Sequence, residues 1–371
     1  MNILIAADYA TPQSGNFIGS LFDLGSTLSA HGDRLCFIFP KAENTVKIGS
    51  WTDWLRNAGF PVFLLDTTLS EDAQFSFLKQ IIAEEKIDIL HIHFGLFHHF
   101  ALHHRKELSC KLIVHEHMEY PVGCNRTKQT LHYIARSALY RFHGVNLISV
   151  NKSVHQAHFF ARHWFVPNGL SEKRNIPQSV DRDDFRKQYG IADNEKAVLF
   201  LGWDIERKGL DIAVQAVQEL RQQGENVILC LLGLGERPKP SSHATDFISA
   251  KTNIDPLSDW IRYLPSQEDM FACHRSMDAY LSASRSEAFS YGILEAISQN
   301  TPVVCSDIQG TSWCWPYSKT FVYPVEDSHK CAEALRSALD AGQTASNYAE
   351  LVEKYSIEKW CEQILTIYRE V

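Results

Sequence analysis

The feature that most constrains this 371-residue chain is an alternation of short apolar runs with longer segments of helical period, which occurs twice. This alternation is typical of parallel sheets whose strands are connected by helices. In the first half, strands are predicted at Ile3–Ala7, Arg34–Phe39, Val62–Leu65, Ile89–Ile92, Leu112–Val114 and Leu147–Val150, and helices at Ile18–His31, Asp72–Glu85 and Thr130–Phe142. In the second half, strands are predicted at Ala197–Leu201, Val227–Leu232, Trp260–Tyr263, Ala279–Leu281, Val303–Cys305 and Phe321–Tyr323. The chain is therefore expected to be an α/β protein with two Rossmann-like, doubly wound domains.

A polar stretch after the tetrapeptide Val166-Pro-Asn-Gly169 interrupts the alternation and marks the predicted domain boundary. We expect a first domain over residues 1–168 and a second over 169–356. Residues 357–371 are expected to form an amphipathic helix that could pack on either domain, including back on the first. Because doubly wound sheets bind ligands at the carboxyl ends of their strands, the ligand is expected in a cleft across which the domains face each other.

Composition excludes several classes of protein. The net charge of −8 argues against a nucleic-acid partner, because phosphate contacts need a basic face. No stretch is apolar for long enough to cross a bilayer, and the start of the chain lacks the features of a signal peptide, so a cytoplasmic protein is expected. The nine cysteines include no Cys-x-x-Cys pair and are expected to be reduced and mostly buried.

The longest stretch that suggests chemistry runs from Ser282 to Ala296 and includes Glu287 and Glu295. It follows a predicted strand and leads into a helix that begins near Tyr291. A small-residue loop and a helix amino terminus offer free N–H groups and a positive dipole end, which suit a phosphate. The two carboxylates suit sugar and ribose hydroxyl groups, although a helix cap and a surface glutamate would account for them equally simply.

A second stretch, Gly202 to Asp211, lies at another predicted strand-to-helix junction and contains Arg207-Lys208-Gly209. Arg offers a forked guanidinium and Lys a point charge, so the pair can neutralise a diphosphate. Taken alone, a basic pair is more often a solvated turn. Its place on the strand ends of the same domain as the two glutamates favours a phosphate site.

The order Arg-Lys-Gly, then Glu-(seven residues)-Glu, preceded by Val-Pro-Asn-Gly, resembles the family-four retaining glycosyltransferases of the GT-B fold. Within that family it is most similar to lipopolysaccharide-core glucosyltransferases. The resemblance implies a hexosyltransferase whose second domain binds a nucleotide-diphosphate sugar, with UDP-sugars favoured. It also implies that the first domain binds a glycan or lipid-linked acceptor, in the synthesis of cell-surface polysaccharide or lipopolysaccharide.

The resemblance also implies roles for individual residues of the second half. Glu287 would contact the donor sugar and Glu295 the ribose, while Arg207 and Lys208 would hold the diphosphate. The backbone amides of four residues would complete the binding site for the phosphates: Phe289, Ser290, Tyr291 and Gly292. One strand segment would lie against the base of the nucleotide: Arg262, Tyr263 and Leu264. The chain departs from the family at Trp203, where many members have Arg, and at Ala288, where Gly is frequent.

In the first half, the resemblance implies a catalytic histidine at the end of the strand that begins at Lys111. His117 aligns best and His115 is the alternative. The segment that contains His91 and His93 likewise resembles the family's Asp-x-x-His-x-His strand. Gly15 matches one of two glycines after the first strand, where a glycine lets the backbone approach the donor phosphates.

Eight of the seventeen histidines fall between residues 91 and 117, which raises the question of a metal site. No His-x-x-x-His motif is completed by a carboxylate, and the family resemblance implies metal-independent catalysis, so no metal and no cofactor are expected. The basic, amphipathic segment Arg126–Arg141 could lie on an anionic membrane or could simply be a packed helix with a solvated edge. The mild excess of basic residues over residues 1–170, 15 Lys and Arg against 14 Asp and Glu, is compatible with such peripheral contact.

Two functional alternatives remain open. The chain could be a catalytically silent GT-B subunit that binds a nucleotide sugar, or a nucleotide-sugar epimerase on the same architecture. Donor hydrolysis would distinguish the first from a transferase, and conversion of the donor without an acceptor would identify the second.

Overall fold

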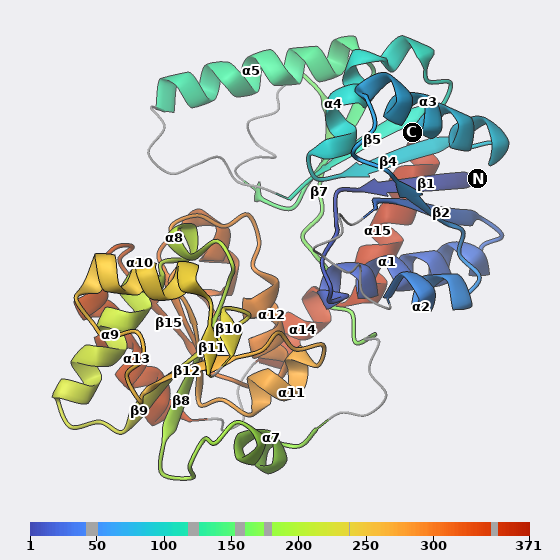
Figure 1. The fold of residues 1–371 in the computed structure, drawn as a ribbon. Coiled ribbons are helices and arrows are strands. Elements are labelled where there is room, and N and C mark those ends of the chain that lie inside the picture. The colour runs from blue at the N-terminus through green and yellow to red at the C-terminus, as the bar shows by residue number, and fades with distance from the viewer. Residues whose placement is uncertain (42–50, 118–125, 153–159, 174–179, 237, 343–347) are drawn as a thin grey trace. The chain divides into compact units, whose positions relative to one another are not determined.

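The computed structural model describes residues 1–371 apart from 42–50, 118–125, 153–159, 174–179, 237 and 343–347; the side chains of 100, 101, 126–130, 132 and 348 also lie outside the description. The chain divides into two compact units (Figure 1). The first comprises Met1–Asn175 and Tyr355–Val371, and the second comprises Ile176–Lys354. None of the described helices combines the length and apolar composition that a membrane span requires.

The first unit is built on a parallel sheet of seven strands in the order β3-β2-β1-β4-β5-β6-β7. Its strands are β1 (Asn2–Ala7), β2 (Arg34–Pro40), β3 (Val62–Leu65), β4 (Ile89–His93), β5 (Lys111–Glu116), β6 (Val145–Ser149) and β7 (Arg162–Phe165). Its helices are α1 (Gly15–Ala30), α2 (Trp51–Asn57), α3 (Glu71–Glu84), α4 (Leu96–His103), η1 (Arg105–Glu107), α5 (Arg126–Phe142) and α15 (Ile357–Glu370).

The pleat of β1 separates two cores on the two faces of this sheet. Ile3 and Ile5 join a cluster that includes apolar residues of α1, α2 and α15. Leu4 and Ala6 join the opposite cluster, with residues of α3, α4 and α5. Both faces are therefore buried under helices, which explains the near-continuous apolar strands in the sequence.

The boundary between the units falls after Asn175, beyond the predicted boundary at 168/169. The side chain of Asn16 in α1 explains the difference, because its Nδ2 donates to the carbonyl of Gly169 at 2.8 Å and its Oδ1 accepts from the amide of Ser171 at 3.0 Å. A Cβ added at Gly169 would lie 2.7 Å from Cβ of Trp360 in α15. These contacts tie residues 169–171 and α15 to the first unit.

The second unit contains a parallel sheet of six strands in the order β12-β9-β8-β13-β14-β15 and a short hairpin, β10-β11. Its strands are β8 (Lys196–Leu201), β9 (Val227–Leu232), β10 (Gly235–Glu236), β11 (Lys239–Pro240), β12 (Ile261–Leu264), β13 (Ala279–Ser282), β14 (Val303–Ser306) and β15 (Thr320–Tyr323). Its helices are α7 (Arg182–Gln188), α8 (Ile205–Lys208), α9 (Leu210–Gln222), α10 (Ser242–Thr252), α11 (Met270–Arg275), α12 (Tyr291–Ser298), η2 (Gln309–Cys314), α13 (Ser328–Ala341) and α14 (Tyr348–Lys354). The two parallel α/β sheets confirm the predicted fold class.

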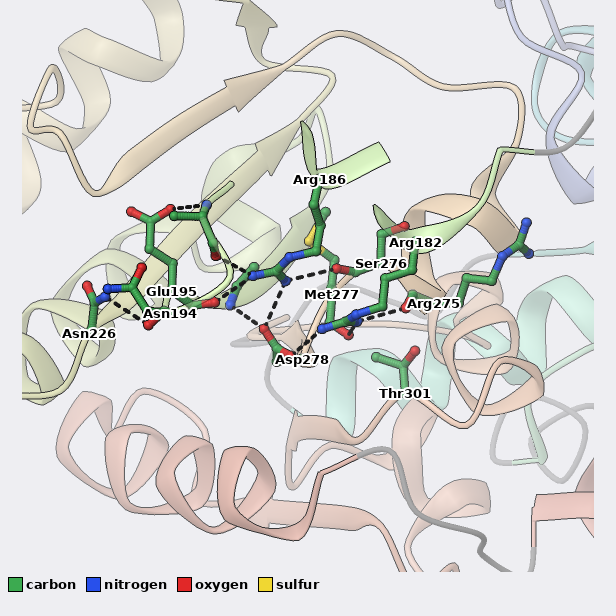
Figure 2. A network of polar contacts seen from close by, with 12 residues as sticks. Arg182, Arg186, Asn194, Glu195, Asn226, Arg275, Ser276, Met277, Asp278 and Thr301 are labelled. Carbon is green, nitrogen blue, oxygen red and sulfur yellow. Dashed lines mark hydrogen bonds and ion pairs between the residues drawn. The ribbon is translucent and has the colours of Figure 1, made fainter. Parts of the chain in front are cut away.

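A network of arginines fastens α7 to the amino end of this sheet (Figure 2). Arg186 is 5% exposed and donates to Asp278 Oδ2 at 3.2 Å and to three backbone carbonyls, those of Ala192, Glu195 and Ser276. Arg182 binds the other oxygen of Asp278 at 2.8 Å. Because every strand of a parallel sheet points the same way, this network lies at the opposite end from the strand carboxyl termini, and its role is structural.

Candidate active site

Two loops meet at the carboxyl ends of β8 and β13 in the second unit. The first carries α8 and ends at Gly209, whose φ of +72° lies in the left-handed region that favours glycine. A Cβ at Gly209 would lie 2.1 Å from the carbonyl oxygen of Ala283, so only glycine permits this approach. The close contact brings Arg207 and Lys208 against the loop that contains Glu287.

Lys208 and Glu287 form the ion pair at the centre of this meeting point. The ammonium group binds Glu287 Oε1, and the two side chains are 20% and 10% exposed. Ser284 Oγ donates to the same carboxylate oxygen at 3.0 Å. The sequence analysis selected these two residues separately, and the structure brings them together. The Glu287 carboxylate thus has two partners, the ammonium group of Lys208 through a charge-assisted hydrogen bond and the hydroxyl group of Ser284.

Arg207 completes the cluster from the same turn. Its Nε donates to Asp204 Oδ2 at 2.7 Å, and one of its terminal nitrogens donates to the carbonyl of Ser286 at 2.9 Å. That nitrogen lies 3.7 Å from Glu287 Oε2. The side chain is 35% exposed, so it is positioned by the protein and remains accessible to an anionic ligand.

The sequence analysis did not select Arg285, although this residue lies within the stretch from Ser282 to Ala296. Its guanidinium binds both carboxylate oxygens of Asp211, at 3.0 and 2.8 Å, and both of Glu326, at 2.6 and 2.9 Å. These hydrogen bonds, with Asp211 the larger cause, raise the pKa of Arg285 above its ordinary value. Its backbone amide donates to the carbonyl of Arg207 at 2.7 Å, so the clamp holds the two loops together.

The amino end of α12 follows the Glu287 loop directly. Ser290 is its N-cap, and its hydroxyl accepts from the amide of Ile293 at 3.4 Å. Phe289 stacks on Trp313 with ring centroids 4.5 Å apart, and a Cβ at Gly292 would lie 2.5 Å from the Tyr280 hydroxyl. The predicted phosphate cradle, 289–292, is therefore packed firmly at a helix amino terminus.

The remaining residues predicted for the nucleotide are placed differently. Glu295 is 4% exposed, and its carboxylate lies 3.8 Å from His274 Nε2. Arg262 binds Glu195 Oε1 at 3.4 Å, which directs its side chain toward the amino end of the sheet, away from the Lys208 loop. Tyr263 donates to the carbonyl of Pro256 at 3.0 Å, and Leu264 is buried. The structure does not bring the side chain of Arg262 together with the cation pair.

In the first unit, His117 lies at the end of β5 and its Nε2 is 2.8 Å from His93 Nδ1. It packs edge-on against Phe17 of α1, with ring centroids 5.8 Å apart. Burial lowers the pKa of His117 to about 3, so the imidazole is neutral near pH 7. Gly15 opens α1 with a φ of +54°, and a Cβ there would lie 3.3 Å from the Tyr9 hydroxyl.

Each unit is matched by a different protein-family model. The model described as Glycosyltransferase Family 4 matches residues 20–172, and the model described as Glycosyl transferases group 1 matches residues 181–355. Together they match most of the chain. The chain belongs to the GT-B glycosyltransferases. This assignment confirms the predicted family resemblance.

Among curated relatives, the phosphatidyl-myo-inositol mannosyltransferase of Mycobacterium leprae is 27% identical over 223 residues, which are 57% of this chain and 57% of the relative. The lipopolysaccharide glucosyltransferase WaaG of Escherichia coli K12 is 22% identical over 217 residues, 55% of this chain and 56% of WaaG. The alignments thus span little more than half the length of each of these relatives.

Solved structures confirm the fold over the whole chain. Anabaena Alr3699/HepE, solved in complex with UDP-glucose, has a TM-score of 0.76 at 16% identity, with full coverage of both chains. The structure of WaaG has a TM-score of 0.65 at 15% identity, covering 99% of each chain.

Proposed function

We propose that this GT-B glycosyltransferase transfers a hexose from a nucleotide-diphosphate sugar, with retention of anomeric configuration, to a glycan or glycolipid acceptor. The observation that carries the proposal is the Lys208–Glu287 pair, with Arg207 beside it, at the carboxyl ends of β8 and β13. Strand carboxyl ends are where doubly wound sheets bind ligands, and α12 begins at the same place.

The proposed mechanism stabilises the leaving group. Cleavage of the sugar–phosphate bond builds negative charge on the diphosphate, and Arg207, Lys208 and the α12 amino end would stabilise that charge. These groups are held in place by ion pairs and by the Arg285 clamp before any ligand binds, so little reorganisation is needed. The acceptor hydroxyl would attack the face from which the diphosphate departs, and the departing phosphate could accept its proton. The proposed transfer step therefore needs no metal ion and no cofactor.

Glu287 would play two roles in this scheme. Its carboxylate, paired with Lys208 and Ser284, neutralises part of the cationic cluster in the free protein and orients the ammonium group. When the donor binds, the same carboxylate is suited to accept hydrogen bonds from the sugar hydroxyl groups. His117 in the first unit is proposed to act near the donor sugar and the acceptor, as a neutral imidazole.

A UDP-hexose is the favoured donor, with GDP-mannose next. The support is that HepE was solved with UDP-glucose and that WaaG is named a glucosyltransferase, whereas the M. leprae relative is named a mannosyltransferase. The side chain of Trp203 is 81% exposed in the loop between β8 and α8, where many family members carry Arg, and its indole would offer a ligand a stacking surface.

A lipid-linked acceptor is favoured by the surface of α5. Leu131, Leu139 and Phe142 are 61%, 45% and 80% exposed on this helix. Arg136, on the same helix, is engaged by Glu116 at 2.8 Å, and the side chains of Arg126 and Lys128 lie outside the described residues. Exposed apolar side chains on a helix that also carries basic residues suit peripheral contact with an anionic membrane in cell-surface glycan synthesis.

The first experiment is a thermal-shift panel of UDP, GDP and ADP, because a ligand that binds the native state raises the melting temperature. The preferred nucleotide sugar is then incubated with the protein, and free sugar and nucleotide are measured. Slow hydrolysis that releases the retained anomer supports the proposal. Binding without hydrolysis would identify a silent subunit, conversion of the donor into an epimer would identify an epimerase, and the absence of any nucleotide shift would refute the site.

A further inference from the structure

Three histidines of the first unit converge on one face of its sheet. His91 and His93 are two residues apart in β4, so their side chains point to the same face. His115 in β5 is the parallel register partner of His93. All three are at most 1% exposed, and one ring nitrogen from each lies within 4.8 Å of the other two.

Four ring nitrogens of these three histidines have no hydrogen-bond partner among the described residues. They are Nε2 of His91, Nε2 of His93 and both ring nitrogens of His115. Buried polar atoms are nearly always paired, because an unpaired group loses its water without compensation. Several orphaned nitrogens on three neighbouring rings point to a ligand shared among them.

The opposite nitrogens of two of these rings are hydrogen-bonded, and the bonds determine which nitrogen is available. His91 Nδ1 lies 2.6 Å from the Tyr368 hydroxyl in α15, and His93 Nδ1 lies 2.8 Å from His117 Nε2. With Nδ1 protonated, each ring donates this bond and keeps its lone pair on Nε2. Metal-ligating histidines are oriented in this way by a partner on the second nitrogen.

We propose that His91, His93 and His115 form a binding site for a divalent transition metal, with Zn²⁺ as the preferred ion. Three imidazoles and no carboxylate suit Zn²⁺ and exclude Mg²⁺ and Ca²⁺, which prefer oxygen ligands. Zn–N bonds of about 2.0–2.1 Å place tetrahedral ligand atoms about 3.4 Å apart, so the ligand atoms must approach by up to about 1.5 Å. The rings of His91 and His115 lie parallel, with an interplanar angle of 2°, so one of them must also turn about its soft χ2 torsion to point its lone pair at the ion. A water molecule or an anion takes the fourth position.

The proposed site uses none of the residues that would hold the diphosphate, and it contacts the proposed chemistry only through His93, which is hydrogen-bonded to His117. Its ligands belong to β4 and β5 of the first unit, whereas Arg207 and Lys208 belong to the second. The site would fix the packing of α15 through Tyr368 and the orientation of His117 through His93. Loss of the metal is thus expected to affect the stability of the first unit, which can be measured without a donor or an acceptor.

The test uses the whole chain, freed of metal with a chelator and then loaded with Zn²⁺ or Co²⁺. Metal content after gel filtration is measured by mass spectrometry, and the Co²⁺ form is examined by visible absorption, which is intense for four-coordinate sites. His115→Gln removes one ligand with a polar side chain of similar length. The double variant His99→Ala/His103→Ala is the matched control, because these residues and Glu71 form an exposed group that could also collect metal.

We expect one equivalent of metal in the wild type and in the control, a rise of about 5 °C in the melting temperature with Zn²⁺, and binding weakened by more than about 100-fold in His115→Gln. Tyr368→Phe is expected to weaken binding by about 10- to 100-fold. Should His115→Gln fail to fold, the Co²⁺ spectrum and the Zn²⁺-dependent melting of the wild type decide. No metal bound by the wild type, or metal lost only in the control variant, overturns the proposal.

Discussion

Replacement of Lys208 by Met separates the structural and the catalytic roles of the central ion pair. Lys208 pairs with Glu287, and the two side chains are 20% and 10% exposed. After the substitution, the carboxylate keeps the Ser284 hydroxyl at 3.0 Å and Arg207 at 3.7 Å. The substitution removes one charge and preserves most of the side-chain volume, so packing changes little.

The expected loss of stability follows from the burial of the pair. Breaking a fully buried pair costs about 3–5 kcal/mol, whereas an exposed pair contributes about 0–1 kcal/mol. With both groups mostly buried and two partners left on the carboxylate, we expect Lys208→Met to lower the free energy of unfolding by about 2 kcal/mol. Glu287→Gln leaves the ammonium unpaired and is expected to cost a similar amount. The double variant is expected to cost less than the sum of the two, because no uncompensated charge remains.

The expected loss of activity has a different origin. A unit charge about 4 Å from a phosphate charge, at an effective dielectric constant of about 20, contributes about 4 kcal/mol. Arg207 and the α12 amino end remain, so we expect Lys208→Met to lose between about 1.4 and 4 kcal/mol of transition-state stabilisation. This corresponds to a decrease in kcat/KM of about 10- to 1000-fold. The double variant should recover stability and not activity.

The assay combines urea unfolding, followed by circular dichroism, with donor hydrolysis at saturating and limiting donor. Lys330→Met is the control, because Lys330 is an exposed lysine of the same unit that pairs with Glu333. Turnover of Lys208→Met within twofold of the wild type would refute the proposed electrostatic role. Recovery of turnover together with stability in the double variant would show that Lys208 acts only through the fold.

Three further predictions concern the scaffold. Gly209→Ala should lower the free energy of unfolding, measured by urea titration, by at least about 3 kcal/mol, because the added Cβ would meet a backbone carbonyl. Gly224→Ala is the control: Gly224 has a similar positive φ with open space around it, so this substitution should cost about 1 kcal/mol. Equal losses in the two variants would contradict the steric argument. Arg186→Ala should lower the free energy of unfolding by about 3 kcal/mol, because three carbonyls lose their donor, whereas Asp278 keeps Arg182 and the amide of Ala197 as partners. A loss below about 1 kcal/mol would show that water replaces the guanidinium. The eight described cysteines should resist thiol reagents at pH 8 until the protein unfolds, because all eight are buried and burial raises the pKa of Cys230 to about 12. Rapid labelling of any of these eight cysteines in the native protein, mapped by mass spectrometry, would contradict this prediction.

The layers of the fold could be predicted because they depend on local patterns. The run Ile3–Ala7 lies within β1, and alternate residues of that strand reach opposite cores, as a period of two requires. The edge strand β7 was missed because its residues are only partly buried and carry little apolar signal.

The site was predictable to a lesser extent. Arg207, Lys208 and Glu287 could be selected because each lies shortly after a predicted strand, at a strand-to-helix junction. The clamp around Arg285 could not, since Asp211 is 74 residues away and Glu326 is 41 residues away in the sequence. The position of the Arg262 side chain also could not be predicted, because it binds Glu195, which is 67 residues away in the sequence and lies at the other end of the sheet.

The sequence by itself thus determined the elements, their order and the loops that carry charge, because periodicity and turn chemistry act over a few residues. The tertiary structure alone decided which charges meet and which are left without partners. His115 shows the reason: strand register, set by packing on both faces of the sheet, places it beside His91 and His93, which their spacing of two residues already puts on one face.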